Sequence, residues 1–195
     1  MLKLLDNNEL KNISIFIIWL INISGFFGIL SDEKEFFLSS SPYVLTLTLL
    51  LLIVNNNSDK KFLIKLSLIF LLGLIVEIIG VNYSIFFGEY KYGNNLGIKF
   101  FGVPLVIGFN WVLLIILTGN FAHRLFSKSK ISKVLFGSIL MILLDLLIEI
   151  SAPKLDYWEF AIHPVPLSNY LWWFVFSFFF HLIYQSDSNK EFVVS

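Results

Sequence analysis

The sequence predicts an all-α membrane protein, a polytopic bundle of about six transmembrane helices. Of its 195 residues, 57% are hydrophobic and 14% are charged, whereas soluble domains carry about 25% charged residues. The mean hydropathy is +0.81. Several apolar runs approach the length of about 20 residues that a helix needs to span a bilayer core. We therefore expect a single integral membrane domain over residues 1–195, with spans at 13–30, 43–54, 62–80, 100–118, 132–150 and 167–184.

The first two runs differ from the others in context and length. Run 13–30 follows an acidic and polar N-terminal segment and has no small-residue cleavage site, so we expect a retained helix and not a signal peptide. Run 43–54 is short for a span. It therefore either crosses with little tilt, thins the bilayer locally, or inserts only half-way.

The distribution of basic residues predicts the orientation, because cytoplasmic connectors of membrane proteins are enriched in Lys and Arg. With the N-terminus inside, four basic residues fall on outer connectors: Lys34, Lys91, Lys99 and Lys154. The other ten of the 14 fall inside: Lys3, Lys11, Lys60, Lys61, Lys65, Arg124, Lys128, Lys130, Lys133 and Lys190. This bias predicts an N-in, C-in topology, with connectors 81–99 and 151–166 on the outer face of a multi-pass inner-membrane protein.

Composition argues against several classes of function. Lys plus Arg and Asp plus Glu both number 14, so no net charge favours nucleic acid as a partner. Cysteine is absent, which removes disulfides and thiolate ligands. His123, His163 and His181 fall at different predicted depths and lack ligand spacing. We therefore expect no metal site and no cofactor, and the lipid bilayer as the surrounding partner.

Three carboxyl groups fall inside predicted spans: Glu77, Asp145 and Glu149. Ionisable groups at membrane depth are costly and are therefore candidates for function. Asp145 and Glu149 are four residues apart and share one helix face, and all three acids fall near the outer ends of their spans. Because no basic residue lies deep in a span, burial favours the neutral acid, which is a proton donor. The alternative is structural: bonds among the acids, to Asn or Tyr, or to loop backbone.

Polar and aromatic residues near these acids are candidate binding residues. Asn110 and Trp111 are expected near mid-membrane, and Asn169 and Trp173 in the outer half of the last span. The connector between the third and fourth spans carries Tyr90 and Tyr92. The alternative for the aromatic residues is an interfacial anchor or an aromatic belt.

Together these residues form two blocks of motifs. The first holds EIIG (77–80), FGEYKY (87–92), LG (96–97), GVP (102–104) and Trp111; the second holds DLLIE (145–149), Ala152, LDYW (155–158) and PLSNYLWW (166–173). Their order and spacing resemble the carotenoid biosynthesis membrane family that includes bisanhydrobacterioruberin hydratase and related carotenoid 1,2-hydratases. The resemblance covers about 77–173, half of the chain. One departure is Ile150, where the family pattern has Pro.

The resemblance implies a hydro-lyase of isoprenoid metabolism that adds water to the terminal isopropylidene double bond of a linear carotenoid. Such chemistry needs an acid to protonate the alkene and a water to capture the tertiary cation, with no metal or nucleotide. It also implies a bacterial or archaeal cell membrane, with other carotenoid-pathway membrane enzymes as candidate partners. Two alternatives stay open: a carotenoid end-group cyclase, and a non-catalytic carotenoid-binding or transport protein.

The acids differ in their predicted roles. Asp145 is expected to be the deepest and most desolvated, which makes it the predicted proton donor. Glu149, nearer the outer surface on the same face, is predicted to orient the attacking water or relay protons. Glu77 is predicted to hold this pair from a facing helix, with Tyr90 or Asn169 as its partners.

Overall fold

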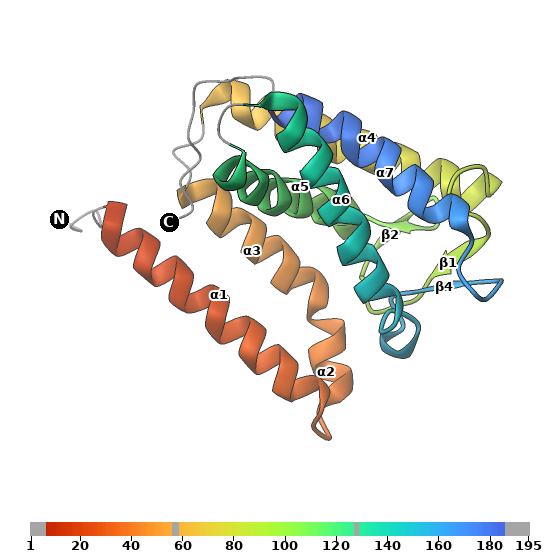
Figure 1. Ribbon diagram of the computed structural model, residues 1–195. Helices are drawn as coiled ribbons and strands as arrows, with labels where there is room; N and C mark the ends of the chain where they lie inside the picture. Colours follow the sequence, from red (N-terminus) through yellow and green to blue (C-terminus); the bar gives the residue numbers. More distant parts are fainter. Residues whose placement is uncertain (1–6, 56–58, 127–128, 186–195) are drawn as a thin grey trace.

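The computed structural model describes residues 7–55, 59–126 and 129–185 (Figure 1). Among them are seven α-helices and two short antiparallel β-ribbons. The elements in chain order are α1 (Asn7–Ile29), α2 (Lys34–Ser39), α3 (Ser41–Asn55), α4 (Lys60–Tyr83), β1 (Tyr90–Tyr92), β2 (Lys99–Phe100), β3 (Val103–Pro104), α5 (Val106–Leu125), α6 (Lys130–Glu149), the 3₁₀ helix η1 (Pro153–Leu155), β4 (Trp158–Phe160) and α7 (Leu167–Tyr184).

The predicted membrane helix bundle is confirmed. In the described part of the chain, four helices are long and apolar enough to cross a membrane, over Asn8–Ile29, Lys60–Tyr83, Val106–Leu125 and Lys130–Glu149. Helix α3 has 15 residues, about 22 Å at 1.5 Å per residue. Helix α7 has 18 residues, with Asn169, Ser177 and His181 buried among its apolar side chains. The count of six spans and the N-in, C-in orientation therefore stay predictions.

Helix α5 forms the centre of the bundle. Of its most apolar stretch, 72% is buried, the largest share among the four candidate spans. Helices α3, α4, α6 and α7 all pack against α5, and α7 also packs against α4 and α6. Helix α1 packs mainly on α2 and α3 and lies at the edge of the bundle (Figure 1). The core that positions the site is thus built from α4 to α7.

Helix α5 begins six residues later than predicted. Residues 99–104 form the β2–β3 hairpin instead, with Phe101 at φ +48° and Gly102 at φ +82° in its turn. Pro104 explains the difference, because a proline lacks the backbone N–H and disfavours helical geometry in the residue before it. As a consequence, Asn110 and Trp111 lie in the first two turns of α5 and not near the middle of that helix, while their depth in the membrane stays a prediction.

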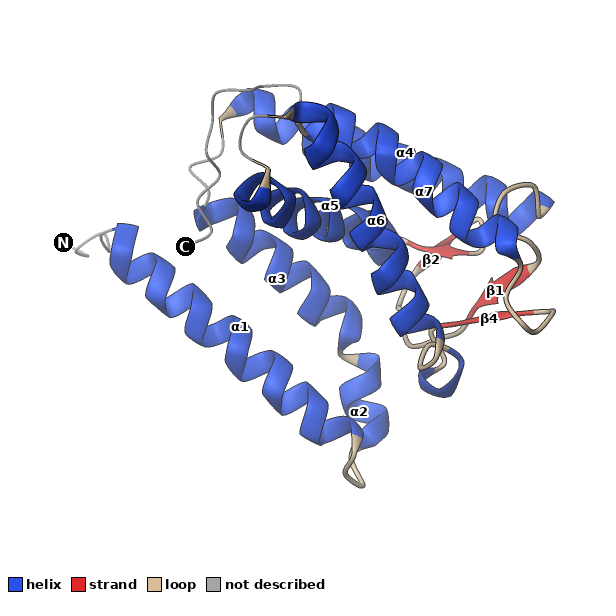
Figure 2. Cartoon of the chain, in the orientation of Figure 1, coloured by secondary structure: helices blue, strands red, loops and turns tan. Residues whose placement is uncertain are grey.

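The second ribbon joins the two long connectors at one end of the bundle (Figure 2). Strand β1 pairs antiparallel with β4, and Tyr90 lies opposite Phe160 while Tyr92 lies opposite Trp158. Because side chains alternate across a strand, Tyr90 and Tyr92 are buried while Lys91 is exposed. This ribbon was not predicted from the sequence.

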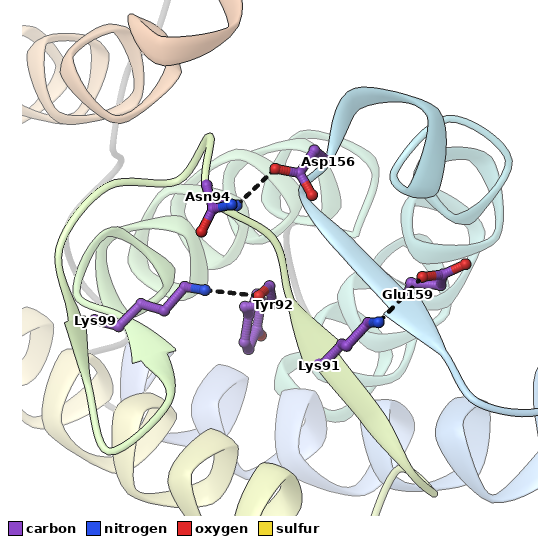
Figure 3. A network of polar contacts seen from close by, with 6 residues as sticks. All are labelled: Lys91, Tyr92, Asn94, Lys99, Asp156 and Glu159. Carbon is purple, nitrogen blue, oxygen red and sulfur yellow. Dashed lines mark hydrogen bonds and ion pairs between the residues drawn. The ribbon is translucent and has the colours of Figure 1, made fainter.

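Polar contacts fix the ribbon's outer side (Figure 3). The carboxylate of Asp156 accepts a hydrogen bond of 2.8 Å from the backbone N–H of Asn94. The ammonium of Lys99 donates one of 2.7 Å to the carbonyl of Tyr92. Lys91 and Glu159 form an exposed ion pair of 3.7 Å. The contacts of Asp156 and Lys91 join the two connectors, whereas that of Lys99 lies within the first connector and braces β1, which carries the inward-pointing tyrosines.

Candidate functional site

One cavity, which we call the acid cavity, lies where α4, α5, α6 and α7 meet the β1–β4 ribbon. Its volume is about 30 Å³, room for about two water molecules. All nine predicted site residues line it, together with four that were not predicted. The lining is Glu77, Phe87, Tyr90, Tyr92, Ile107, Asn110, Trp111, Asp145, Glu149, Trp158, Phe160, Asn169 and Trp173.

Glu77 accepts three hydrogen bonds from side chains. The hydroxyls of Tyr90 and Tyr92 donate to Oε2 at 2.6 and 2.7 Å, and Nε1 of Trp111 donates to Oε1 at 3.0 Å. The side chain is 3% exposed. Glu77 therefore ties the ribbon to α5 from α4, and both of its oxygens are engaged as acceptors.

The helix face that carries Glu77 is shaped to receive these donors. Gly73 and Gly80 lie four residues before and three after Glu77, on the same face. A Cβ at Gly73 would come within 2.9 Å of the Trp111 ring, and one at Gly80 within 2.7 Å of Phe87 and 2.9 Å of the Tyr90 hydroxyl. Only glycine allows these rings to approach α4 so closely.

The two tyrosines remain hydrogen-bond donors over the physiological pH range. Burial, and after it the negative charge of Glu77, raises the pKa of both Tyr90 and Tyr92 well above the usual value for tyrosine. A phenol in such surroundings keeps its proton. Both hydroxyls therefore point their hydrogens at Glu77 and not into the cavity.

Asp145 and Glu149 form a second cluster, joined by Asn169 of α7. The amide Nδ2 of Asn169 donates to Oδ2 of Asp145 at 2.7 Å and lies 3.5 Å from Oε1 of Glu149. Asp145 is 2% exposed, whereas Glu149 is half-buried. In the described part of the chain, Asn169 is the one hydrogen-bond donor to Asp145, and no Lys or Arg pairs with either acid. This pair is consequently much less satisfied than Glu77.

Two details of the predicted arrangement need correction. Helix α4 continues to Tyr83, so Glu77 lies six residues, about 9 Å, from its end, and not three. Asp145 lies four residues, about 6 Å, from the end of α6. Depth therefore does not single out Asp145. The partners are also divided: Tyr90 contacts Glu77, whereas Asn169 contacts Asp145.

Aromatic rings form much of the remaining wall. Trp111 stacks on Trp173 with ring centroids 4.4 Å apart, and Phe180 meets Trp111 edge-on at 5.3 Å. Trp172, the neighbour of Trp173, instead packs on Phe86 at 4.8 Å, outside the cavity. Electron-rich ring faces stabilise a nearby cation, so the wall suits a positively charged intermediate.

Four lining residues were missed by the sequence analysis: Phe87, Ile107, Trp158 and Phe160. The strand residues among them carried a signal, because YKY at 90–92 and WEF at 158–160 both alternate aromatic and charged residues. Such alternation is typical of a strand with one buried face. Trp158 lies beside Glu149 and brings an indole ring to the acid pair.

The histidines lie away from this cavity. His181 contacts Thr118 at 2.9 Å and the Ser177 carbonyl at 2.7 Å, and His123 contacts Lys133 at 2.9 Å. Within the described residues, no group of three or more His, Cys, Asp or Glu side chains is arranged to hold a metal ion.

A comparison with protein-family models decides the family. Residues 40–193 match the model of the family described as carotenoid biosynthesis protein. The chain belongs to the carotenoid biosynthesis protein family. The match spans both motif blocks and every residue that lines the acid cavity. No curated protein and no solved structure matches the chain.

Proposed function

We propose that this membrane protein of the carotenoid biosynthesis family is a carotenoid hydratase. The observation that carries the proposal is the Asp145–Glu149 pair: two carboxyls without a cation partner in the described residues, in an aromatic cavity with room for about two waters. The substrate is the terminal isopropylidene group of a linear carotenoid. The enzyme is a hydro-lyase acting in the direction of hydration.

The reaction begins with proton transfer from Asp145. The carboxyl O–H gives its proton to the CH carbon of the (CH₃)₂C=CH end group, and the alkene electron pair forms the new C–H bond. The tertiary cation that remains faces the Trp111, Trp173 and Trp158 rings, which stabilise positive charge. Water then attacks the cation, and Glu149 accepts the proton that the water loses.

The cycle closes when that proton returns to Asp145. Glu149 and Asp145 share Asn169 as a hydrogen-bonding neighbour, so a water between them completes a short relay. The net change is addition of one water to one double bond, with both acids regenerated. Neither a metal nor a redox cofactor enters this balance.

Glu77 has a positioning role in this scheme. Its oxygens are engaged by Tyr90, Tyr92 and Trp111, whereas Asp145 accepts only from Asn169 in the described residues. An acid whose oxygens are both occupied by donors is poorly placed to protonate an alkene. Glu77 holds the ribbon and Trp111 in place while Asp145 reacts.

The cavity size favours hydration over end-group cyclisation. Cyclisation needs the same first protonation but must also enclose the folded six-carbon segment that closes the ring. A cavity of about 30 Å³ must open to admit the isopropylidene group and would have to open much further for a ring. It already has room for water, the second reactant of hydration.

Expression in a lycopene-producing host, followed by mass analysis of the extracted pigments, tests the proposal. A hydratase adds the mass of one water per reacted end and produces a tertiary alcohol. A cyclase gives ring ends at unchanged mass, and a binding protein leaves lycopene unaltered. The double variant Asp145→Asn, Glu149→Gln is the matched control and should leave lycopene unchanged. Ring-ended or unaltered lycopene from the wild type would refute the hydratase.

A further inference from the structure

A second, larger cavity lies beside the acid cavity, and we call it the lateral groove. Its volume is about 390 Å³, within the 300–1,000 Å³ typical of small-molecule sites. It lies between α1 and α3 on one side and α5 and α6 on the other. Most of the side chains in its wall are apolar. The lining is Ile21, Asn22, Gly25, Phe26, Ile29, Phe37, Ser41, Val44, Leu45, Leu96, Ile107, Asn110, Ile148, Ser151, Tyr157 and Trp158.

The two cavities share a wall. Ile107, Asn110 and Trp158 line both of them. These residues come from the first turns of α5 and from β4, the elements that also hold the acid cavity. A molecule in the lateral groove therefore lies against residues that also line the cavity of Asp145 and Glu149.

We propose that the lateral groove binds the apolar chain of a linear isoprenoid polyene and delivers its end group past Trp158 and Asn110 into the acid cavity. This inference rests on the proposed function. Three observations select this occupant: the apolar wall, the volume, and the contact with a cavity too small to hold the chain itself. A rigid polyene lies along the groove while only its terminal isopropylidene group reaches the acids.

Helix α1 supplies the outer wall of this groove. Its apolar stretch is 11% buried, it packs mainly on α2 and α3, and it lines the groove opposite residues of α5 and α6. The family match begins at residue 40, so α1 and α2 lie outside the matched part. Helix α1 therefore sets the groove width in this particular chain, and with it the polyene that fits.

A larger side chain at Gly25 should block the groove. It lines the groove from α1, and a Cβ built there meets no atom within 4 Å. Gly25→Leu therefore adds a side chain to the groove wall at a position where its Cβ meets open space. Ser24→Leu is the matched control, because Ser24 is exposed on the same helix and does not line the groove. Ile21→Trp narrows the groove from the preceding turn of α1 and serves as a second blocking variant.

The test uses the full chain in phospholipid nanodiscs, titrated with lycopene while the shift of its visible absorption band reports binding, a signal that the added tryptophan of Ile21→Trp does not contribute to. Gly25→Leu and Ile21→Trp should each raise the Kd for lycopene at least ten-fold, and Ser24→Leu should stay within two-fold of wild type. Thermal unfolding of each variant checks that the fold is intact.

The outcomes separate this inference from the hydratase proposal. One outcome is that the wild type binds lycopene, Gly25→Leu binds it more weakly, and no water is added to it. This outcome refutes the hydratase and supports the groove as the binding site. Wild-type affinity in Gly25→Leu and Ile21→Trp overturns the groove, as expected if a phospholipid acyl chain occupies it. Absence of lycopene binding by the wild type overturns it as well.

Discussion

Replacing Asp145 by Asn removes the proposed proton donor with little change in shape. Asparagine matches aspartic acid in size and keeps one carbonyl oxygen, which can still accept the 2.7 Å hydrogen bond from Asn169. It has no acidic proton to give to an alkene. The variant therefore isolates the chemical step from the packing of α6 against α7.

The expected loss of rate in Asp145→Asn follows from the role of a general acid. A positioned acid contributes about 10² to 10⁴ in rate, or about 2.7 to 5.4 kcal/mol at 1.36 kcal/mol per factor of ten. Because an alkene is a weak base, we expect the upper part of this range for Asp145→Asn. The Kd for lycopene should stay within about two-fold, because Asp145 does not line the lateral groove.

The assay compares the rate of water addition by the purified variants, measured by mass analysis of extracted pigment. Glu149→Gln is the internal comparison and should retain more activity than Asp145→Asn, because bulk water can replace Glu149 as the proton acceptor at this half-buried position. Hydration by Asp145→Asn at a rate near that of the wild type would refute the assignment. Glu77 would then become the leading candidate for the donor.

Three further predictions concern the frame around the acids. Glu77→Gln places an amide N–H against a hydrogen-bond donor and should lower the free energy of unfolding by about 2 to 3 kcal/mol, measured by chemical denaturation. An unchanged denaturation midpoint would contradict the role of Glu77 in joining α4 to the ribbon. Asp156→Ala loses the 2.8 Å bond to Asn94 and should cost about 1 kcal/mol, whereas Glu159→Ala, in an exposed ion pair, should cost under about 0.5 kcal/mol. Reporter fusions should place residues 81–99 outside the cell, and a cytoplasmic signal there would reverse the predicted orientation.

Much of the helical framework was predictable because run length alone limits what can span a bilayer. The last predicted span, 167–184, coincides with α7. The predicted start of α5 was wrong because the apolar run continues through 100–105, whereas Pro104 prevents a helix from forming there. The proline overrode the apolar pattern at that point, and Asn110 and Trp111 consequently lie nearer the start of their helix than predicted.

The acids were identifiable because a carboxyl at membrane depth is rare enough to stand out in a sequence. Their partners were harder to predict, because those partners come from distant parts of the chain. Trp158 and Phe160 reach the cavity through pairing of β4 with β1, about 70 residues away, and a three-residue strand carries little periodicity. The separation of Glu77 from the Asp145–Glu149 pair likewise depends on which donors the fold brings to each oxygen.

The juxtaposition of a small polar cavity and a larger apolar groove addresses the central difficulty of alkene hydration. A carboxylic acid protonates an alkene only where water does not compete for its proton, yet the resulting cation must then meet a water molecule. The acid cavity, at about 30 Å³, admits few waters, and an end group that enters displaces part of them. We expect the remaining water beside Glu149, at the half-buried end of the pair. On this proposal, the division of volume between the two cavities determines the order of the steps: the polyene chain stays dry in the lateral groove, and only its end meets acid and water.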